Sequence, residues 1–431
     1  MPNAHLANVS AEIRSLILSE LPKEALLACR LVCRILSVHT TPLAFRHVLL
    51  TARHAASADS FIRICEAEHL RQLVHEVTCD TYVGDWCRYR GGKGYKVPAA
   101  FLAALPYMRH LRSLRSLNIF FSKYTARRNV DMRYPTNLGV AETTDFRFRV
   151  LNMIFEALRG TWHKKMWIPL FLDLHLPQDD FSPNVDDEKG DGDGEGPIEL
   201  ASLAISNLSD FIDRRLMRSR AFQEILAAPS LKSLKLLITH WEKEIEPELR
   251  LELPDLYEVY ENLPLTWLKP AVAQKLTTLS LYDRHYFGWC PKLDLRLINP
   301  DGGLPNLRVL ALGHYVFSHD WQVDWVAGLG SLQELYLDDC PILWRAIVRP
   351  PLDDENYPTA EAFNAGPNND RVEIGLPLRW HAVLWVERDA GVLLLDDDEI
   401  GIQFGVHTRA LDEAALEDLL MSLTKAEVLD I

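Results

Sequence analysis

The first apolar pattern of the chain predicts a short helix that begins after Ser10 and is ended by Pro22. Ser10 is a suitable N-cap because its hydroxyl can accept a hydrogen bond from the first helical turn. An apolar stripe repeats along this helix at helical spacing, and Leu18 lies outside it. The stripe consists of Ile13, Leu16, Ile17 and Leu21.

The next apolar pattern predicts a helix over residues 23–38 that is apolar on almost every side. Its polar surface is reduced to Arg30 and Arg34, one turn apart. Such a helix must be covered on several sides, and two helices of roughly 30 residues together cannot provide that cover. Either the rest of the chain or a partner has to cover it.

A recurring L-x-x-L-x-L string predicts short buried strands that lie parallel to one another. The last four strings start 45, 31 and 25 residues apart, which is too irregular for a regular repeat. We therefore expect an α/β fold in which a small N-terminal helical motif precedes an irregular leucine-rich-repeat-like solenoid with insertions. The alternative is an α/β domain whose buried strands happen to be rich in leucine. The strings are Leu114/Leu117/Ile119, Leu231/Leu234/Leu236, Leu276/Leu279/Leu281, Leu307/Leu310/Leu312 and Leu332/Leu335/Leu337.

The remaining periodic segments predict helices and strands that alternate along the chain. Alternation of this kind implies a parallel sheet, and near the C-terminus we expect it to change to an antiparallel edge. The predicted helices are 146–159, 201–226, 321–329 and 411–423, and the predicted strands are 166–176, 382–388 and 391–395.

Composition and charge narrow the class of protein. The chain has 431 residues, 48% of them hydrophobic, and a formal charge of −14. Half of that charge lies in residues 179–197, where eight acidic residues face one lysine, and this segment is expected to be a disordered loop. The negative charge disfavours nucleic acid as a partner, and the absence of a long apolar run predicts no membrane contact. Seven scattered cysteines without a CxxC pair indicate a reducing compartment, cytoplasmic or nuclear.

Motifs that would indicate an enzyme or a metalloprotein are absent from the sequence. GxSxG, HExxH, Walker A and GxGxxG do not occur, so no catalytic residue, cofactor or metal is predicted. His314, His319 and Asp320 are interpreted as turn and cap residues. Cys29 and Cys33, four residues apart, are expected to pack in a core.

Residues 10–36 read SAEIRSLILSELPKEALLACRLVCRIL and resemble the F-box motif. The family usually opens with Leu-Pro, where this chain has Val9-Ser10, and we expect weaker docking from that departure. Residues 39–50, 70–80 and 313–343 are similar to segments of fungal F-box proteins with degenerate repeats. The matching positions are Glu12-Ile13, Ile17-Leu18, Leu21-Pro22, Leu26-Leu27 and Val32-Cys33-Arg34.

The resemblance implies a non-catalytic role in a Skp/cullin/F-box ubiquitin ligase. Residues 1–50 would hold the motif that binds a Skp-type adaptor, and residues 51–431 would recognise an unknown target protein. Two other hypotheses stay open: a scaffold whose F-box-like helices pack on its own domain, and an unrecognised enzyme suggested by size alone. By the resemblance, the residues divided between the motif's own core and the adaptor surface are Ile13, Ile17, Leu18, Leu21, Pro22, Leu26, Leu27, Leu31 and Val32.

Overall fold

The structure is a computed structural model that describes residues 9–84, 98–123, 142–162, 197–239, 254–300, 302–348, 350–359, 372–376, 378 and 392–394. The described residues belong to two compact units. Unit 1 lies within residues 1–88, 93–121 and 149–202, and unit 2 lies within 89–92, 122–148 and 203–431. The predicted elements at 166–176, 382–388 and 411–423 fall outside the described residues, as does the acidic segment 179–197 except for Pro197.

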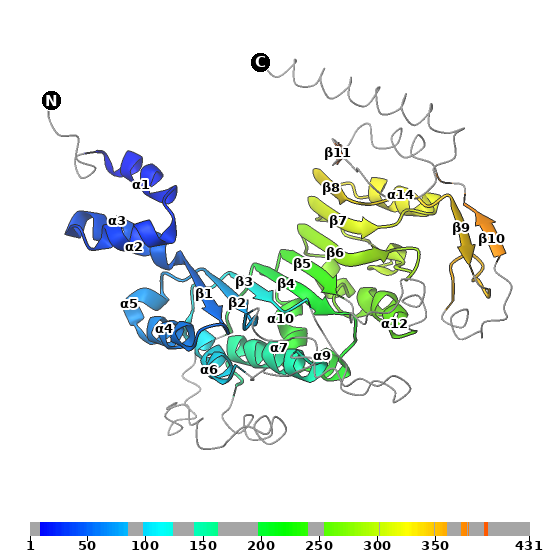
Figure 1. Ribbon diagram of the computed structural model, residues 1–431. Coiled ribbons are helices and arrows are strands. Elements are labelled where there is room, and N and C mark those ends of the chain that lie inside the picture. Colours follow the sequence, from blue (N-terminus) through cyan, green and yellow to red (C-terminus); the bar gives the residue numbers. More distant parts are fainter. Residues whose placement is uncertain are drawn as a thin grey trace, which may run out of the picture. The chain divides into compact units, whose positions relative to one another are not determined.

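The chain begins with three helices, α1 (Ala11–Ser19), α2 (Lys23–Arg30) and α3 (Arg34–Arg46) (Figure 1). The predicted cap is confirmed, because the Ser10 hydroxyl accepts a hydrogen bond from the Ile13 amide at 3.4 Å. The single helix predicted over residues 23–38 is wrong. Cys33 is extended, with φ −160° and ψ 163°, and separates α2 from α3. Helix α3 then runs directly into the first strand, His47–Thr51. The predicted boundary between the N-terminal motif (1–50) and the rest of the chain (51–431) falls inside this strand.

Unit 1 contains three parallel strands, β1 (His47–Thr51), β2 (Glu76–Asp80) and β3 (Ser116–Phe120). Alternate side chains enter the core, as the period of a strand requires. Helices lie on one side of these strands (Figure 1). They are α4 (Ala55–Glu66), α5 (Glu68–Arg71), α6 (Ala99–Ala104) and the 3-10 helix η2 (Leu105–His110).

Unit 2 is built on a sheet whose described strands follow the order β4-β5-β6-β7-β8-β11. Its pairings from β5 to β8 and from β8 to β11 are parallel. The strands predicted from the leucine strings are confirmed, because the second and third members of the last four strings are buried in β5 to β8 and those of the first string in β3. The strands are β4 (Ser202–Ser209), β5 (Ser233–Thr239), β6 (Thr278–Phe287), β7 (Val309–Tyr315), β8 (Glu334–Asp338) and β11 (Val392–Leu394).

The connections between the unit 2 strands differ in kind. Helices α12 (Pro254–Asn262), η5 (Leu263–Leu265) and α13 (Pro270–Ala273) lie between β5 and β6. Only η6 (Leu295–Leu297) lies between β6 and β7 in the described part, and α14 (Asp320–Ala327) lies between β7 and β8. The remaining elements are α7 (Thr144–Arg159), α9 (Arg214–Arg218), α10 (Arg220–Ala227), β9 (Arg345–Val348) and β10 (Val372–Gly375).

These connections correct the expected architecture. The α/β class holds, but a helical motif followed by a leucine-rich-repeat-like solenoid is wrong: the structure is a mostly parallel sheet accompanied by helices. A solenoid needs one repeated unit, and no unit recurs among the described connections. The leucine strings correctly indicated buried parallel strands, but such strands occur in α/β sheets as well as in solenoids.

Individual elements were predicted with mixed success. The helices expected at 146–159 and 321–329 are confirmed as α7 and α14. The helix expected at 201–226 is wrong, because its first part forms β4 and only its second part is helical. The predicted antiparallel edge stays a prediction, because its residues 382–388 fall outside the described residues. Its other segment contains β11, which pairs with β8 in parallel. A described antiparallel pair, β9 with β10, forms a separate sheet.

Candidate functional site: the exposed apolar surface of the N-terminal helices

The three N-terminal helices share one very small core. Leu18, Leu26 and Ala44 are its buried members, one from each helix. Leu21, Leu43 and Phe45 pack against them and are only partly buried. A core of this size can use a minority of the apolar residues in α1 to α3, so the others must lie elsewhere.

Leu36 is also buried, but most of the other large apolar side chains are exposed to solvent. Leu31 is 89% exposed, Val32 70% and Leu16 67%, values that are unusual for side chains of this size. The exposed set comes from all three helices and from the turn between α2 and α3. We call the set the N-terminal apolar surface; its members are Ile13, Leu16, Ile17, Leu27, Leu31, Val32, Ile35 and Val38.

The structure divides the predicted adaptor-binding residues into two groups. Leu18 and Leu26 are buried in the small core, and Leu21 packs against it. Pro22 is exposed at the start of α2. The exposed apolar members of the prediction are Ile13, Ile17, Leu27, Leu31 and Val32.

Sequence reasoning missed three members of the surface, Leu16, Ile35 and Val38. Leu16 belonged to the predicted stripe of α1, and that stripe faces solvent while Leu18, outside the stripe, is buried. Periodicity identifies one apolar side of a helix but does not say what covers it. The signal for Ile35 and Val38 was their place in a helix that is apolar all round.

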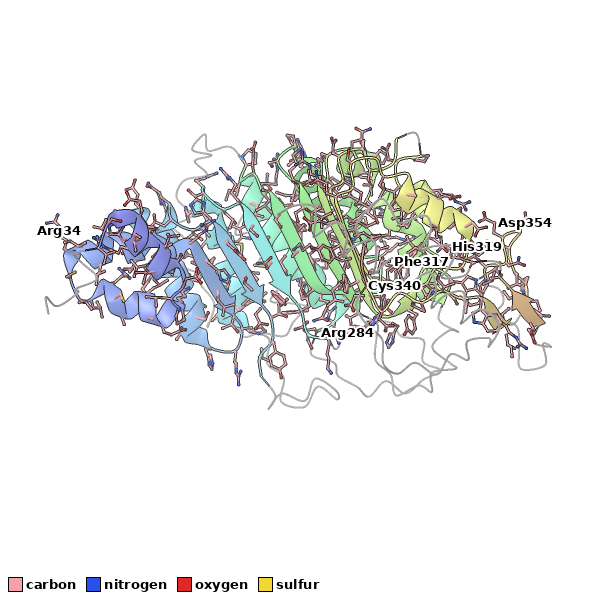
Figure 2. All side chains as sticks on the ribbon, turned by 90° about the horizontal axis from the view of Figure 1, so that it is seen from above. Arg34, Arg284, Phe317, His319, Cys340 and Asp354 are labelled. Atoms are coloured by element: carbon pink, nitrogen blue, oxygen red, sulfur yellow. The ribbon has the colours of Figure 1, made fainter. Side chains whose placement is uncertain are left out.

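Basic side chains accompany the N-terminal apolar surface. Arg34, the first residue of α3, is exposed and points outward (Figure 2). The Arg30 guanidinium lies 4.8 Å from the centre of the Phe45 ring, a cation–π geometry. Lys23 donates from Nζ to the His47 carbonyl at 2.8 Å, and burial of the ammonium lowers its pKa. Basic side chains of α2 and α3 therefore accompany the exposed apolar residues of this segment.

The two cysteines of this region do not pack as predicted. Cys33 is exposed and Cys29 is half-buried, so the expectation that both lie in a core is wrong. Cys33 occupies the extended break before α3, which turns its side chain out of the helical packing. Elsewhere the described cysteines Cys65, Cys79 and Cys340 are buried, and burial raises the pKa of the Cys340 thiol to about 12.

A cluster of charged side chains in unit 2 joins two loops that are far apart in the sequence. Lys292 Nζ donates to the carboxylates of Asp353 at 2.8 Å and Glu355 at 3.2 Å, and Arg296 contacts Glu355 through two bonds of 2.9 and 2.8 Å. His319 stacks on Tyr357, with ring centres 4.5 Å apart. His319 and Asp354 lie at the same end of unit 2 (Figure 2). We call this cluster the loop clasp; its side chains bind one another and so hold the loops together.

Of the predicted turn and cap residues, His319 is confirmed as the cap of α14, with the Gln322 side chain completing the capping box. The interpretation of His314 as a turn residue is wrong, because His314 lies within β7, in the left-handed region at φ 62°. Within the described ranges no group of three or more His, Cys, Asp or Glu could hold a metal ion. No helix in the described part of the chain is long and apolar enough to cross a membrane.

One lysine has a strongly shifted pKa. Burial, with Lys232 and Lys269 nearby, lowers the pKa of Lys275 to about 8. Its ammonium donates to the carbonyls of Leu226 and, at 2.5 Å, Ala228, which are the last carbonyls of α10. A cation at the C-terminus of a helix is a stabilising cap, so the shift has a structural cause.

Comparison with known proteins adds no family to this geometry. No family model matches the chain, and no curated protein matches it. The F-box resemblance of residues 10–36 therefore stays a prediction, and the site is defined by its own exposure and chemistry.

Proposed function

We propose that this chain is the substrate-recognition subunit of a Skp/cullin/F-box ubiquitin ligase, cytoplasmic or nuclear, that binds a Skp-type adaptor through its N-terminal helices. The observation that carries the proposal is the N-terminal apolar surface. Eight large apolar side chains are exposed within residues 13–38, the segment whose residues resemble the F-box motif. Large apolar side chains that are exposed together in one short segment are typical of interaction sites.

The energetics favour a protein partner. Full burial of one such side chain contributes about 1.5–3 kcal/mol, while association costs about 4–15 kcal/mol in lost freedom. Eight side chains can therefore supply a net driving force if a partner covers most of them. Arg34 and Arg30 at the margin would contribute polar contacts around the apolar centre, as in ordinary protein interfaces.

The role we propose for the chain is non-catalytic, with the sheet of unit 2 presenting a target protein for ubiquitin transfer. The scaffold hypothesis required the N-terminal helices to pack on the chain's own domain. Among the described residues, the core shared by the three helices holds Leu18, Leu26 and Ala44 with three neighbours, whereas eight large apolar side chains of the same segment stay exposed. That observation favours a separate partner.

Co-purification with a fungal Skp-type adaptor tests the proposal. We expect the wild-type chain to retain the adaptor and Leu31→Asp/Val32→Asp to lose it, because two carboxylates would be desolvated at the interface. Both positions are exposed, so the variant should fold normally. Leu265→Asp is the matched control, since Leu265 is 66% exposed in unit 2. Retention of the adaptor by the double variant, or no retention by the wild type, would refute the proposal.

A further inference from the structure

One face of the unit 2 sheet carries exposed and partly exposed side chains. Strands β6, β7 and β8 are parallel, and parallel sheets usually bury both faces. Here alternate positions are buried, and the positions between them are mostly exposed or half-exposed in the part of the chain that the structure describes. The register aligns these positions in three rows: Thr278, Val309 and Glu334; Ser280, Ala311 and Tyr336; Tyr282, Gly313 and Asp338.

The middle strand of this face carries only small side chains. Val309, Ala311 and Gly313 occupy the three positions of β7. Gly313 has to be small, because a Cβ atom there would lie 2.1 Å from Cδ1 of Tyr282. The Tyr282 ring therefore lies over β7. The longer side chains of β8 lie on the other side of these small β7 residues.

Strand β8 gives the face its chemistry. Glu334, Tyr336 and Asp338 are all exposed, and the Tyr336 hydroxyl donates to the Glu334 carboxylate at 2.7 Å. The Tyr336 side chain is 40% exposed, so its ring is accessible. In the described residues neither Glu334 nor Asp338 forms an ion pair. By contrast, the neighbouring Asp339 accepts from the Tyr286 hydroxyl and lies 3.2 Å from Nε2 of His314.

Among the described residues, the basic side chains of the same face lie away from β8. Lys235 is in the row of Tyr336 but on β5, three strands away, which is about 14 Å at the usual strand spacing. Arg284 is bound to the Asn207 side chain at 2.8 and 3.1 Å. Charges more than about 10 Å apart are largely screened at ordinary salt. In the part of the face that the structure describes, the β8 side is thus negative.

We propose that this face binds a basic, extended segment of a protein, with a lysine or arginine side chain held by Glu334, Tyr336 and Asp338. The two carboxylates form charge-assisted hydrogen bonds with the cation, and the Tyr336 ring offers a cation–π contact. The small side chains of Val309 and Ala311 on β7, beside the Tyr282 ring, leave room for the backbone of the segment. This inference rests on the proposed function in one respect. The segment would belong to the target protein that the ubiquitin ligase modifies.

The test uses the full chain and a fluorescein-labelled ten-residue peptide of alternating lysine and serine, with a glutamate–serine peptide for comparison. Fluorescence anisotropy at low salt should show binding of the lysine peptide alone. Glu334→Gln/Asp338→Asn should weaken binding about tenfold, as expected for the loss of two ion pairs. Tyr336→Ala should weaken binding about threefold to fivefold, and Tyr336→Phe, which keeps the ring, by less than twofold.

A control variant distinguishes a site from general charge attraction. Asp320→Asn/Asp324→Asn removes the same charge from exposed positions of α14 and should bind the lysine peptide like the wild type. An equal loss in this control, or no loss in the Glu334/Asp338 variant, would overturn the inference. The assay contains no adaptor, so it can fail while adaptor binding succeeds, and the reverse.

Discussion

The N-terminal helices and the unit 2 sheet are both rich in leucine, but the sheet buries its leucines whereas the helices expose several of theirs. Leu310, the second residue of β7, is completely buried, whereas Leu31 is 89% exposed. The sheet has helices with which to bury its leucines, while α1 to α3 have a core of three buried residues. Leucine therefore belongs to a buried core in the sheet and, in our proposal, to an uncovered interface in the N-terminal helices.

The largest effect should separate the two regions directly. Leu310→Ala leaves a cavity among the buried leucines of β6 to β8 and should lower the free energy of unfolding by about 2–5 kcal/mol. Leu31→Ala removes the same atoms from solvent and should change it by less than about 0.5 kcal/mol. Urea unfolding followed by circular dichroism measures both. Similar losses at the two positions would show that the surface is covered within the chain.

A second substitution pair tests the same contrast inside α1. Leu18→Ala should destabilise the N-terminal helices by about 2 kcal/mol, because Leu18 is buried in a core with few other members. Leu16→Ala, two residues earlier and 67% exposed, should leave them nearly unchanged. Amide hydrogen exchange of residues 11–46 reports the local stability. Faster exchange in the Leu16 variant than in the Leu18 variant would reverse our assignment of the two sides of α1.

The smallest effect concerns the loop clasp, where stability depends on charge. Hydrogen bonds from Arg296, followed by those from Lys292, lower the pKa of Glu355 to about 2. A lowered pKa in the folded state stabilises the fold above the unfolded-state value, and this contribution is lost as pH falls from about 4.5 to about 2. Glu355 is 38% exposed, so solvent screening limits the contribution to less than about 1 kcal/mol.

Glu355→Gln should therefore reduce stability at pH 7 and match the wild type near pH 2. Thermal unfolding over that pH range measures the difference. Asp354→Asn is the control, because Asp354 is exposed beside the clasp and forms no ion pair among the described residues. A constant difference between Glu355→Gln and wild type at every pH would contradict the assignment.

The sequence predicted the strands better than their arrangement. Leucines at alternate positions have to enter a core, so Leu279, Leu281, Leu310 and Leu312 located β6 and β7 correctly. The same pattern fits any buried parallel strand, which is why a solenoid was inferred where the connections show an α/β sheet.

Other features had no local signal in the sequence. The break at Cys33 follows from an extended backbone that neither glycine nor proline marks. The division between Leu16 and Leu18 depends on which side of α1 meets α3. The loop clasp joins Lys292 to Asp353, 61 residues apart, and spacing along the chain does not report such a contact.

The central claim is that the N-terminal apolar surface is the docking site of an adaptor, and amide hydrogen exchange with and without a fungal Skp-type adaptor tests it most directly. Our account predicts slower exchange in α1, in α3 and at residues 31–33 when the adaptor is added, with little change in β5 to β8. Unchanged exchange in residues 11–46, or protection confined to unit 2, would contradict it.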